Sequence, residues 1–103
     1  MNSAIRPSIG HPKFSERRDT ALGRSFAITF GPGQQLPTHT NPSRIVISVV
    51  RGSGNLALST EQRRQLAAGD VVQLEPREPH GIAAGTDGLE LEVTMVQNCC
   101  GAC

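Results

Sequence analysis

Histidine and cysteine are the residues of this sequence that could carry chemistry, and each occurs three times in 103 residues. A neutral imidazole can bind a transition metal or take up a proton near neutral pH, so His39 and His80 are the first candidates for a site. They could be metal ligands or a pair that binds a small molecule; alternatively, water or backbone groups could satisfy them. His11 lies in a polar segment next to Pro12, and we predict that it is a surface residue.

The cysteines all fall within the last five residues, at Cys99, Cys100 and Cys103. Disulfides that stabilise a small secreted domain link distant elements, which these positions cannot do. The Cys-x-x-Cys spacing is compatible with redox or metal chemistry, whereas the terminal position favours an inert tail. A further alternative is that the tail folds back and adds a thiolate to an ion held by His39 and His80, since seven residues can span roughly 23 Å.

The elements that must position these side chains are predicted to be short β-strands. Eleven glycines and seven prolines are scattered in short clusters, which is typical of strands joined by tight turns. Residues 89–95 alternate apolar and polar, as in a strand with one buried face. In the strongly β-forming segment 45–50, Ile45, Ile47 and Val49 are predicted to pack in the core, and the alternative is that they line an apolar substrate pocket.

A chain of this length has room for one domain. Its predicted parts are an N-terminal arm or edge strand at 1–24, a β-barrel at 25–97 and a cysteine-containing tail at 98–103. Inside the barrel we predict strands at 25–30 and 71–74. We predict a loop at 34–42 and turns at 51–55 and at Asp87-Gly88, the latter a hairpin signal.

Two stretches resemble the paired sequence motifs of the cupin superfamily. The first family motif contains Gly, two His, Glu and a final Gly, and its positions here are Gly33, His39, Asn41, Ile45 and Gly52. The second contains Gly, Pro, Gly, His and Asn, and its positions here are Gly69, Glu75, Arg77, His80 and Ala84. The resemblance covers residues 33–84 directly. It implies an all-β, single-domain jelly-roll barrel of two antiparallel sheets.

In members of the family that use a metal, the resemblance implies that these His and Glu side chains hold one divalent ion inside the barrel. Here Asn41 replaces the second His and Ile45 replaces the Glu, so His39, His80 and Asn41 are left as candidate metal ligands. An amide is a weak ligand for zinc, copper or nickel. The predicted cofactor is therefore one weakly held divalent ion (zinc, nickel, iron, manganese or copper) or none. Asn41 could equally contact a ligand or cap the turn that it begins with Pro42.

The resemblance implies a barrel protein that binds a small molecule near His39 and His80. The alternative is a metal-dependent enzyme of the dioxygenase, isomerase or decarboxylase type with a reduced ligand set, and the sequence leaves open whether the protein is an enzyme. Small cupins commonly form homodimers, so a homodimer is expected. Glu75 and Glu78 lie close to His80 in sequence; they could approach the mouth of the barrel, but we predict that they are solvated turn residues.

Charge and aromatic content argue against two other classes of partner. The formal net charge is +1, and there are three Phe and no Tyr or Trp, so neither a basic track nor a stacking platform for nucleic acid is predicted. No apolar stretch approaches the roughly 20 residues of a membrane span, and residues 1–10 lack the layout of a secretory signal. We therefore expect a cytoplasmic protein without nucleic-acid or membrane partners.

Overall fold

The computed structural model describes residues 11–21, 23–58 and 62–96, and the regular elements in these ranges are all β-strands. They are β1 (Lys13–Phe14), β2 (Arg18–Asp19), β3 (Gly23–Phe30), β4 (Gln35–His39), β5 (Arg44–Ala57), β6 (Arg63–Ala67), β7 (Val71–Leu74) and β8 (His80–Val96). Every pair of neighbouring strands is antiparallel. The predicted all-β class is therefore confirmed. The described ranges contain no helix that could span a membrane.

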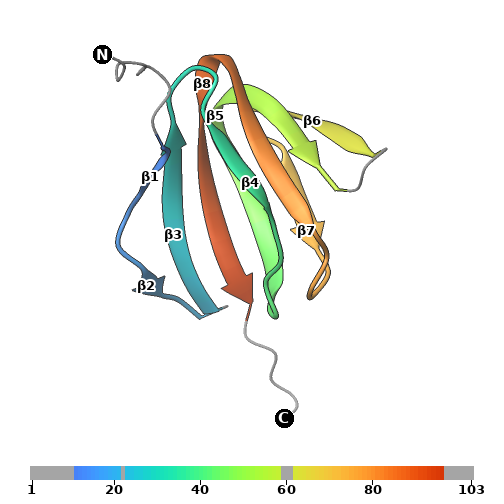
Figure 1. Ribbon diagram of the computed structural model, residues 1–103. Helices are drawn as coiled ribbons and strands as arrows, with labels where there is room; N and C mark the ends of the chain where they lie inside the picture. The colour runs from blue at the N-terminus through green and yellow to red at the C-terminus, as the bar shows by residue number, and fades with distance from the viewer. Residues whose placement is uncertain (1–10, 22, 59–61, 97–103) are drawn as a thin grey trace, which may run out of the picture.

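Two long bent strands, β5 and β8, lie side by side at the centre of the sheet (Figure 1). The first part of β5 pairs with β7 and its last part with β6, while β8 runs along both parts. The start of β8 also pairs with β4 and its end with β3. Because each long strand contributes to both sides, the sheet folds over on itself, and the start and end of β8 run along different sides of the molecule in Figure 1.

The turns predicted at 51–55 and at Asp87-Gly88 are wrong, because β5 and β8 continue through both segments. The glycines lie where the two strands bend over one end of the molecule, without a loop between two separate strands (Figure 1). Gly52 has a φ of +86° and Gly88 a φ of +78°, and a Cβ at Gly52 would lie 2.2 Å from the carbonyl oxygen of Gly88. The two backbones pass so closely that only glycine fits at this crossing.

The loop predicted at 34–42 is also wrong over part of its length, because residues 35–39 form β4. Pro37 is what argued against a strand, since proline cannot donate a backbone hydrogen bond. The structure accommodates it where the register of the β4–β8 pair shifts, between Leu36 and His39. At such an irregularity the missing N–H leaves no ladder bond unmade.

The other strand predictions are confirmed, including 25–30 within β3 and 71–74 as β7. Leu89, Leu91 and Val93 are buried, as the alternation predicts, and so are the expected core residues of β5, Ile45, Ile47 and Val49. The described part of the N-terminal segment supplies β1 and β2, which both pair with β3.

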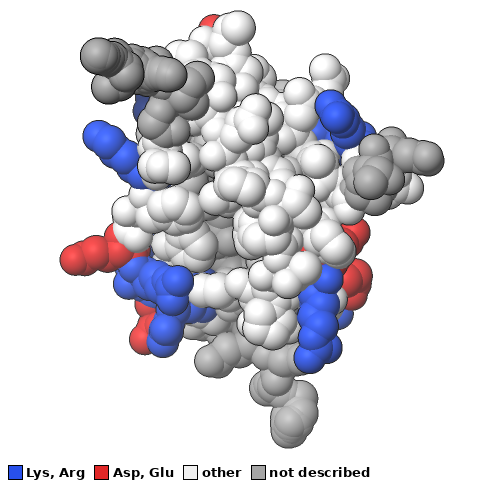
Figure 2. Space-filling view, viewed as in Figure 1, with Lys and Arg blue, Asp and Glu red and all other residues white. Residues whose placement is uncertain are grey.

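The outward side of β8 carries ion pairs that tie it to its neighbours. Glu92 lies 2.9 Å from the guanidinium of Arg18, and Glu90 lies 2.9 Å from that of Arg51. Exposed pairs of this kind contribute at most about 1 kcal/mol each. In the face shown in Figure 2, the charged side chains drawn in colour lie toward the two sides, and the middle is white. Charge is therefore peripheral on this face.

Candidate functional site

The barrel encloses a cavity of about 340 Å³ with a predominantly apolar wall. Four strands supply most of that wall: Phe26 and Ile28 of β3, Leu36, Pro37, Thr38 and His39 of β4, Ile45 and Ile47 of β5, and His80, Ile82, Val93 and Met95 of β8. Alternate residues of a barrel strand face inward, which explains the spacing within β3 and β5. Ile45 and Ile47 thus serve both as core and as cavity wall.

His39 and His80 lie in this wall, and they face each other directly. His39 ends β4, His80 begins β8, and the two are partners in the register of the β4–β8 pair. Their ring centroids are 4.3 Å apart and the ring planes are inclined at 58°. His80 is 3% exposed, whereas His39 is open to solvent. The expectation that these two residues meet inside the barrel is confirmed.

Backbone carbonyls hold both imidazoles through the same ring nitrogen. Nδ1 of His39 lies 2.9 Å from the carbonyl oxygen of Pro37, and Nδ1 of His80 lies 2.8 Å from that of Glu78. A carbonyl oxygen only accepts, so each Nδ1 carries the proton and each neutral ring has its lone pair on Nε2. The site therefore offers two lone pairs that the backbone does not use.

Burial favours the neutral form of His80. Desolvation lowers the pKa of this imidazole below 6.5, and the positive charge that His39 can carry lowers it further. The hydrogen bond to the Glu78 carbonyl and the charge of the Glu78 carboxylate act in the opposite direction without reversing the shift. His80 is consequently an uncharged acceptor at neutral pH.

Asn41 lines the cavity, but its side chain is already engaged in a turn. Its Oδ1 accepts the backbone N–H of Ser43 at 2.8 Å, and its Nδ2 contacts the sulfur of Met95 at 3.7 Å. Its backbone carbonyl accepts the N–H of Arg77 at 2.7 Å. The structure thus shows Asn41 in the turn-capping role. Its role as a metal ligand stays a prediction.

The residues present do not fit a closed divalent-metal site. Within the described part of the chain no group of three or more His, Cys, Asp or Glu is placed to hold an ion. Ile45 fills the position where the family has Glu, and two imidazoles fall short of the three protein ligands typical of catalytic zinc. Residues 99–103 lie outside the described residues, so the proposed thiolate stays a prediction.

The remaining residues that the sequence singled out lie away from the cavity. His11 is exposed, as predicted. Glu75 pairs with Arg44 at 3.0 Å, and the side chain of Glu78 accepts the backbone N–H of Glu75 at 3.0 Å. Both carboxylates therefore stabilise the turn before His80, which confirms their assignment to that turn.

Sequence reasoning missed two residues of the N-terminal segment, Phe14 and Arg17. Phe14 lines the cavity, and its ring centroid lies 6.0 Å from that of Phe26. The guanidinium carbon of Arg17 lies 5.7 Å from the centroid of Phe26. The only signal in the sequence is a single Phe near an Arg-Arg pair, which is too common a pattern to predict a contact with the barrel.

Comparison with known proteins agrees with this architecture. The model of the cupin domain family matches residues 26–97. An RmlC-like cupin protein from Desulfovibrio desulfuricans superposes with a TM-score of 0.74 at 20% identity, over 93% of each chain. An uncharacterised conserved protein with a double-stranded β-helix domain from Klebsiella pneumoniae superposes with a TM-score of 0.72 at 22% identity, over 90% of this chain and 84% of that one.

A third similar structure is an enzyme, a DMSP lyase from Ruegeria pomeroyi. Its TM-score is 0.68 at 17% identity, and the match covers 74% of this chain but 39% of the lyase. At such identities the likeness shows the fold and leaves the chemistry open. No curated protein matches the chain in sequence.

Proposed function

This chain belongs to the cupin superfamily, and we propose that it binds a small, largely apolar organic molecule in its barrel, with the His39–His80 pair as the polar contact. The observation that carries the proposal is the arrangement of the two rings. Both Nδ1 atoms are bound to carbonyls, and both Nε2 lone pairs are left for a guest.

The cavity suits such a guest in size and in chemistry. Its volume of about 340 Å³ is at the low end of the roughly 300–1,000 Å³ that ligand sites span, which favours a small molecule. Burying the apolar part of the guest contributes about 25 cal/mol per Å² of apolar surface. The two Nε2 atoms only accept when the rings are neutral, so a hydroxyl group, which donates one hydrogen bond, is the natural partner of buried His80. A guest without a donor would leave buried His80 unsatisfied.

A metal-dependent enzyme is the alternative function, and one observation favours it. Imidazoles that bind metals usually donate their other N–H to a carbonyl or carboxylate, as both rings do here. The described residues lack a third ligand of the usual kind. Binding of a small molecule needs no third ligand, so we propose that function first.

Matched probes test the proposal. Phenol carries the hydroxyl donor, and anisole is the same ring without it. We expect saturation-transfer NMR to show phenol bound about tenfold or more tightly than anisole, because a lost donor leaves an acceptor unpaired. His80→Ala should abolish that preference, and His11→Ala, at an exposed position, should retain it. Equal binding of both probes to the unaltered protein would contradict the proposal.

Metal content separates the two functions. Elemental analysis of the purified protein, of His39→Ala and of His80→Ala gives the ratio of metal to chain. We expect a ratio well below one in all three. A ratio near one in the unaltered protein, lost in both variants, would instead support the enzyme.

A further inference from the structure

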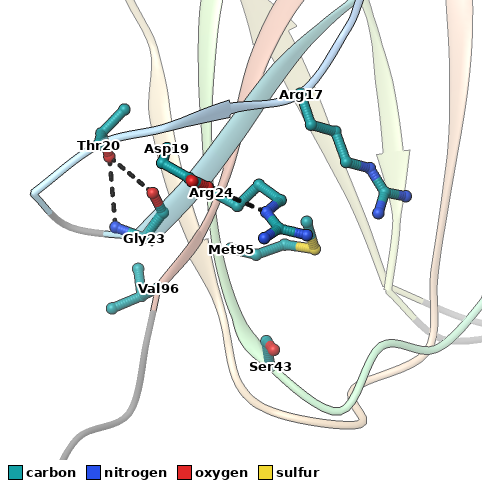
Figure 3. Close-up of a pocket in the computed structure, with 8 residues that line it drawn as sticks. All are labelled: Arg17, Asp19, Thr20, Gly23, Arg24, Ser43, Met95 and Val96. Carbon is teal, nitrogen blue, oxygen red and sulfur yellow. Dashed lines mark hydrogen bonds and ion pairs between the residues drawn. The ribbon is translucent and has the colours of Figure 1, made fainter.

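A second hollow adjoins the barrel cavity at the end where Met95 lies. It has a volume of about 650 Å³, and Met95 lines both spaces. Its charged residues are Arg17, which precedes β2, Asp19 of β2 and Arg24 of β3, while Ser43 comes from the turn before β5 (Figure 3). The barrel cavity therefore leads to a region of different polarity, and its far side is built by a segment outside the two cupin motifs.

The charges that line this hollow do not cancel. Oδ1 of Asp19 lies 3.2 Å from Nε of Arg24, so this carboxylate offsets that guanidinium (Figure 3). The ion pairs within the described residues involve Arg18, Arg24, Arg44 and Arg51, and none involves Arg17. Two cations and one anion leave a net charge of +1 along the lining, and the uncompensated charge is on Arg17.

Arg17 lies next to a residue of the cavity wall, so its positive charge is close to the barrel cavity. Its guanidinium carbon lies 5.7 Å from the centroid of Phe26, and Phe26 lines the cavity. A guanidinium on an aromatic face is attracted to the ring and keeps its N–H edges available. Those N–H groups match the two oxygens of a carboxylate, which they bind in parallel.

We infer that the ligand of the barrel is a small monocarboxylic acid, with its apolar body in the cavity and its carboxylate on Arg17; this inference rests on the proposed function. The histidine pair and Arg17 select opposite groups on the ligand. The Nε2 atom of the buried His80 presents a lone pair, which repels an anion and accepts from a hydroxyl. Arg17 presents only donors and a positive charge. A hydroxy acid has a group for each end, with the hydroxyl donating to the Nε2 of His80 and the carboxylate accepting from Arg17.

The test compares 4-hydroxybenzoic acid with 4-hydroxybenzamide by titration calorimetry on the full chain. The two probes share ring and hydroxyl and differ in the negative charge. We expect the acid to bind at least tenfold more tightly, and Arg17→Gln to bring the ratio of the two dissociation constants close to one. Arg18→Gln is the matched control, because Arg18 is paired with Glu92, and it should keep the full ratio. Arg17→Lys should keep part of it, since the charge remains without the planar fork.

The outcomes separate this inference from the proposed function. If both probes bind equally to the unaltered protein and His80→Ala weakens both, the barrel is a binding site and the carboxylate assignment is wrong. If Arg17→Gln keeps the preference for the acid, Arg17 does not bind the carboxylate and the inference is overturned. If neither probe nor phenol binds, both the proposed function and the inference fail. A preference that also shrinks as salt rises from 50 to 500 mM supports a charge contact at a partly exposed site.

Discussion

Strands β3, β5 and β8 run through both ends of the barrel with the same apolar alternation, yet the interior of one end is packed and the other end holds the cavity, which β4 also lines. The packed end comprises Phe30 of β3, Val49 and Leu56 of β5, and Leu89 and Leu91 of β8, which are buried and do not line the cavity. The cavity end comprises the wall residues Phe26, Ile28, Ile45, Ile47 and Val93 of the same strands, together with the histidine pair. Hydrophobicity therefore does not distinguish the two ends.

Backbone approach distinguishes them. At the packed end β5 and β8 bend at Gly52 and Gly88, where there is no room for a Cβ, and the close crossing lets the surrounding side chains interdigitate. At the cavity end His39 and His80 face each other across the β4–β8 pair, and the guanidinium carbon of Arg17 lies 5.7 Å from the ring centroid of Phe26. Polar groups that need partners occupy the place where the packed end has only apolar contacts. The two ends therefore differ in the groups that meet there, which are two glycine backbones at the packed end and two imidazoles at the cavity end.

The largest expected effect comes from adding one methyl group at the crossing. Gly52→Ala forces an L-residue to a φ of +86° and a Cβ to 2.2 Å from a carbonyl oxygen. A left-handed conformation costs about 1–2 kcal/mol and overpacking about 1–3 kcal/mol, so we expect a loss of about 2–5 kcal/mol in unfolding free energy. Chemical denaturation of the variant measures it.

Gly69→Ala is the matched control for that loss. Gly69 has a φ of +95° but nothing within 4 Å of its added Cβ, so only the conformational cost of about 1–2 kcal/mol applies. Equal losses in the two variants would show that the crossing is not tight, and the explanation for the packed end would then be wrong.

A carboxylate tests whether the cavity end is a metal site that lacks a ligand. Ile45→Glu restores the family residue beside the two imidazoles, and without metal it should cost about 1–3 kcal/mol, because a polar group is buried without a partner. Added zinc or manganese should then raise the melting temperature, since a ligand at a hundred times its dissociation constant contributes about 2.7 kcal/mol. Ile45→Gln is the uncharged control and should show no such rise. If neither metal raises the melting temperature of Ile45→Glu, the histidines do not converge on a common ion position.

The sequence predicted the inward faces of the strands but not the space between them. The alternation at 89–95 and the apolar run at 45–50 identify buried side chains, because period two fixes which face each residue takes. Whether Ile45 packs or lines a cavity depends on how far apart the opposite walls lie, and no local pattern encodes that distance. The motif spacing succeeded for His39 and His80 because it reflects barrel geometry.

The wrong turn and loop predictions have the same cause, because local sequence does not show which strands pair. Gly52-Ser53-Gly54 and Asp87-Gly88 have the composition of turns, and only the partner strand shows that they are bends within long strands. Pro37 similarly argued against β4, although a shifted register accommodates it. Arg17 escaped notice because its contact with Phe26 depends on β1 and β2 pairing with β3. Each of these features is set by tertiary contacts.

Lowering the pH should reduce the free energy of unfolding, because His80 at the cavity end is buried in its neutral form. The pKa of His80 is lowered in the folded state by burial, so above 6.5 the imidazole is neutral in both states and has no effect on stability. As the pH falls below 6.5 the unfolded chain takes up the proton first, and stability decreases until the pH passes the lower folded pKa. We expect the unfolding free energy to fall between pH 7.5 and pH 5.5.

His80→Gln should flatten this profile, and His11→Gln, at an exposed position, should leave it as it is. Each profile is measured relative to the same variant at pH 8, so any constant loss of stability in His80→Gln cancels. If the unfolding free energy of His80→Gln depends on pH as strongly as that of the unaltered protein, another group titrates. The pH dependence would then not distinguish the cavity end from the packed end.

The smallest expected effect lies in the turn that leads to His80. At the packed end the residues with positive φ are glycines, but here Arg77 adopts a φ of +65°, at the position where the family motif has Gly. A non-glycine residue in this conformation costs about 1–2 kcal/mol, and the greater freedom of glycine in the unfolded chain returns about 0.4–1 kcal/mol of that. Arg77→Gly should therefore stabilise the protein by up to about 1.6 kcal/mol, measured as a rise in the denaturation midpoint. The N–H that Arg77 donates to Asn41 is retained in the variant, so a loss of stability would mean that the Arg77 side chain itself supports the turn before His80.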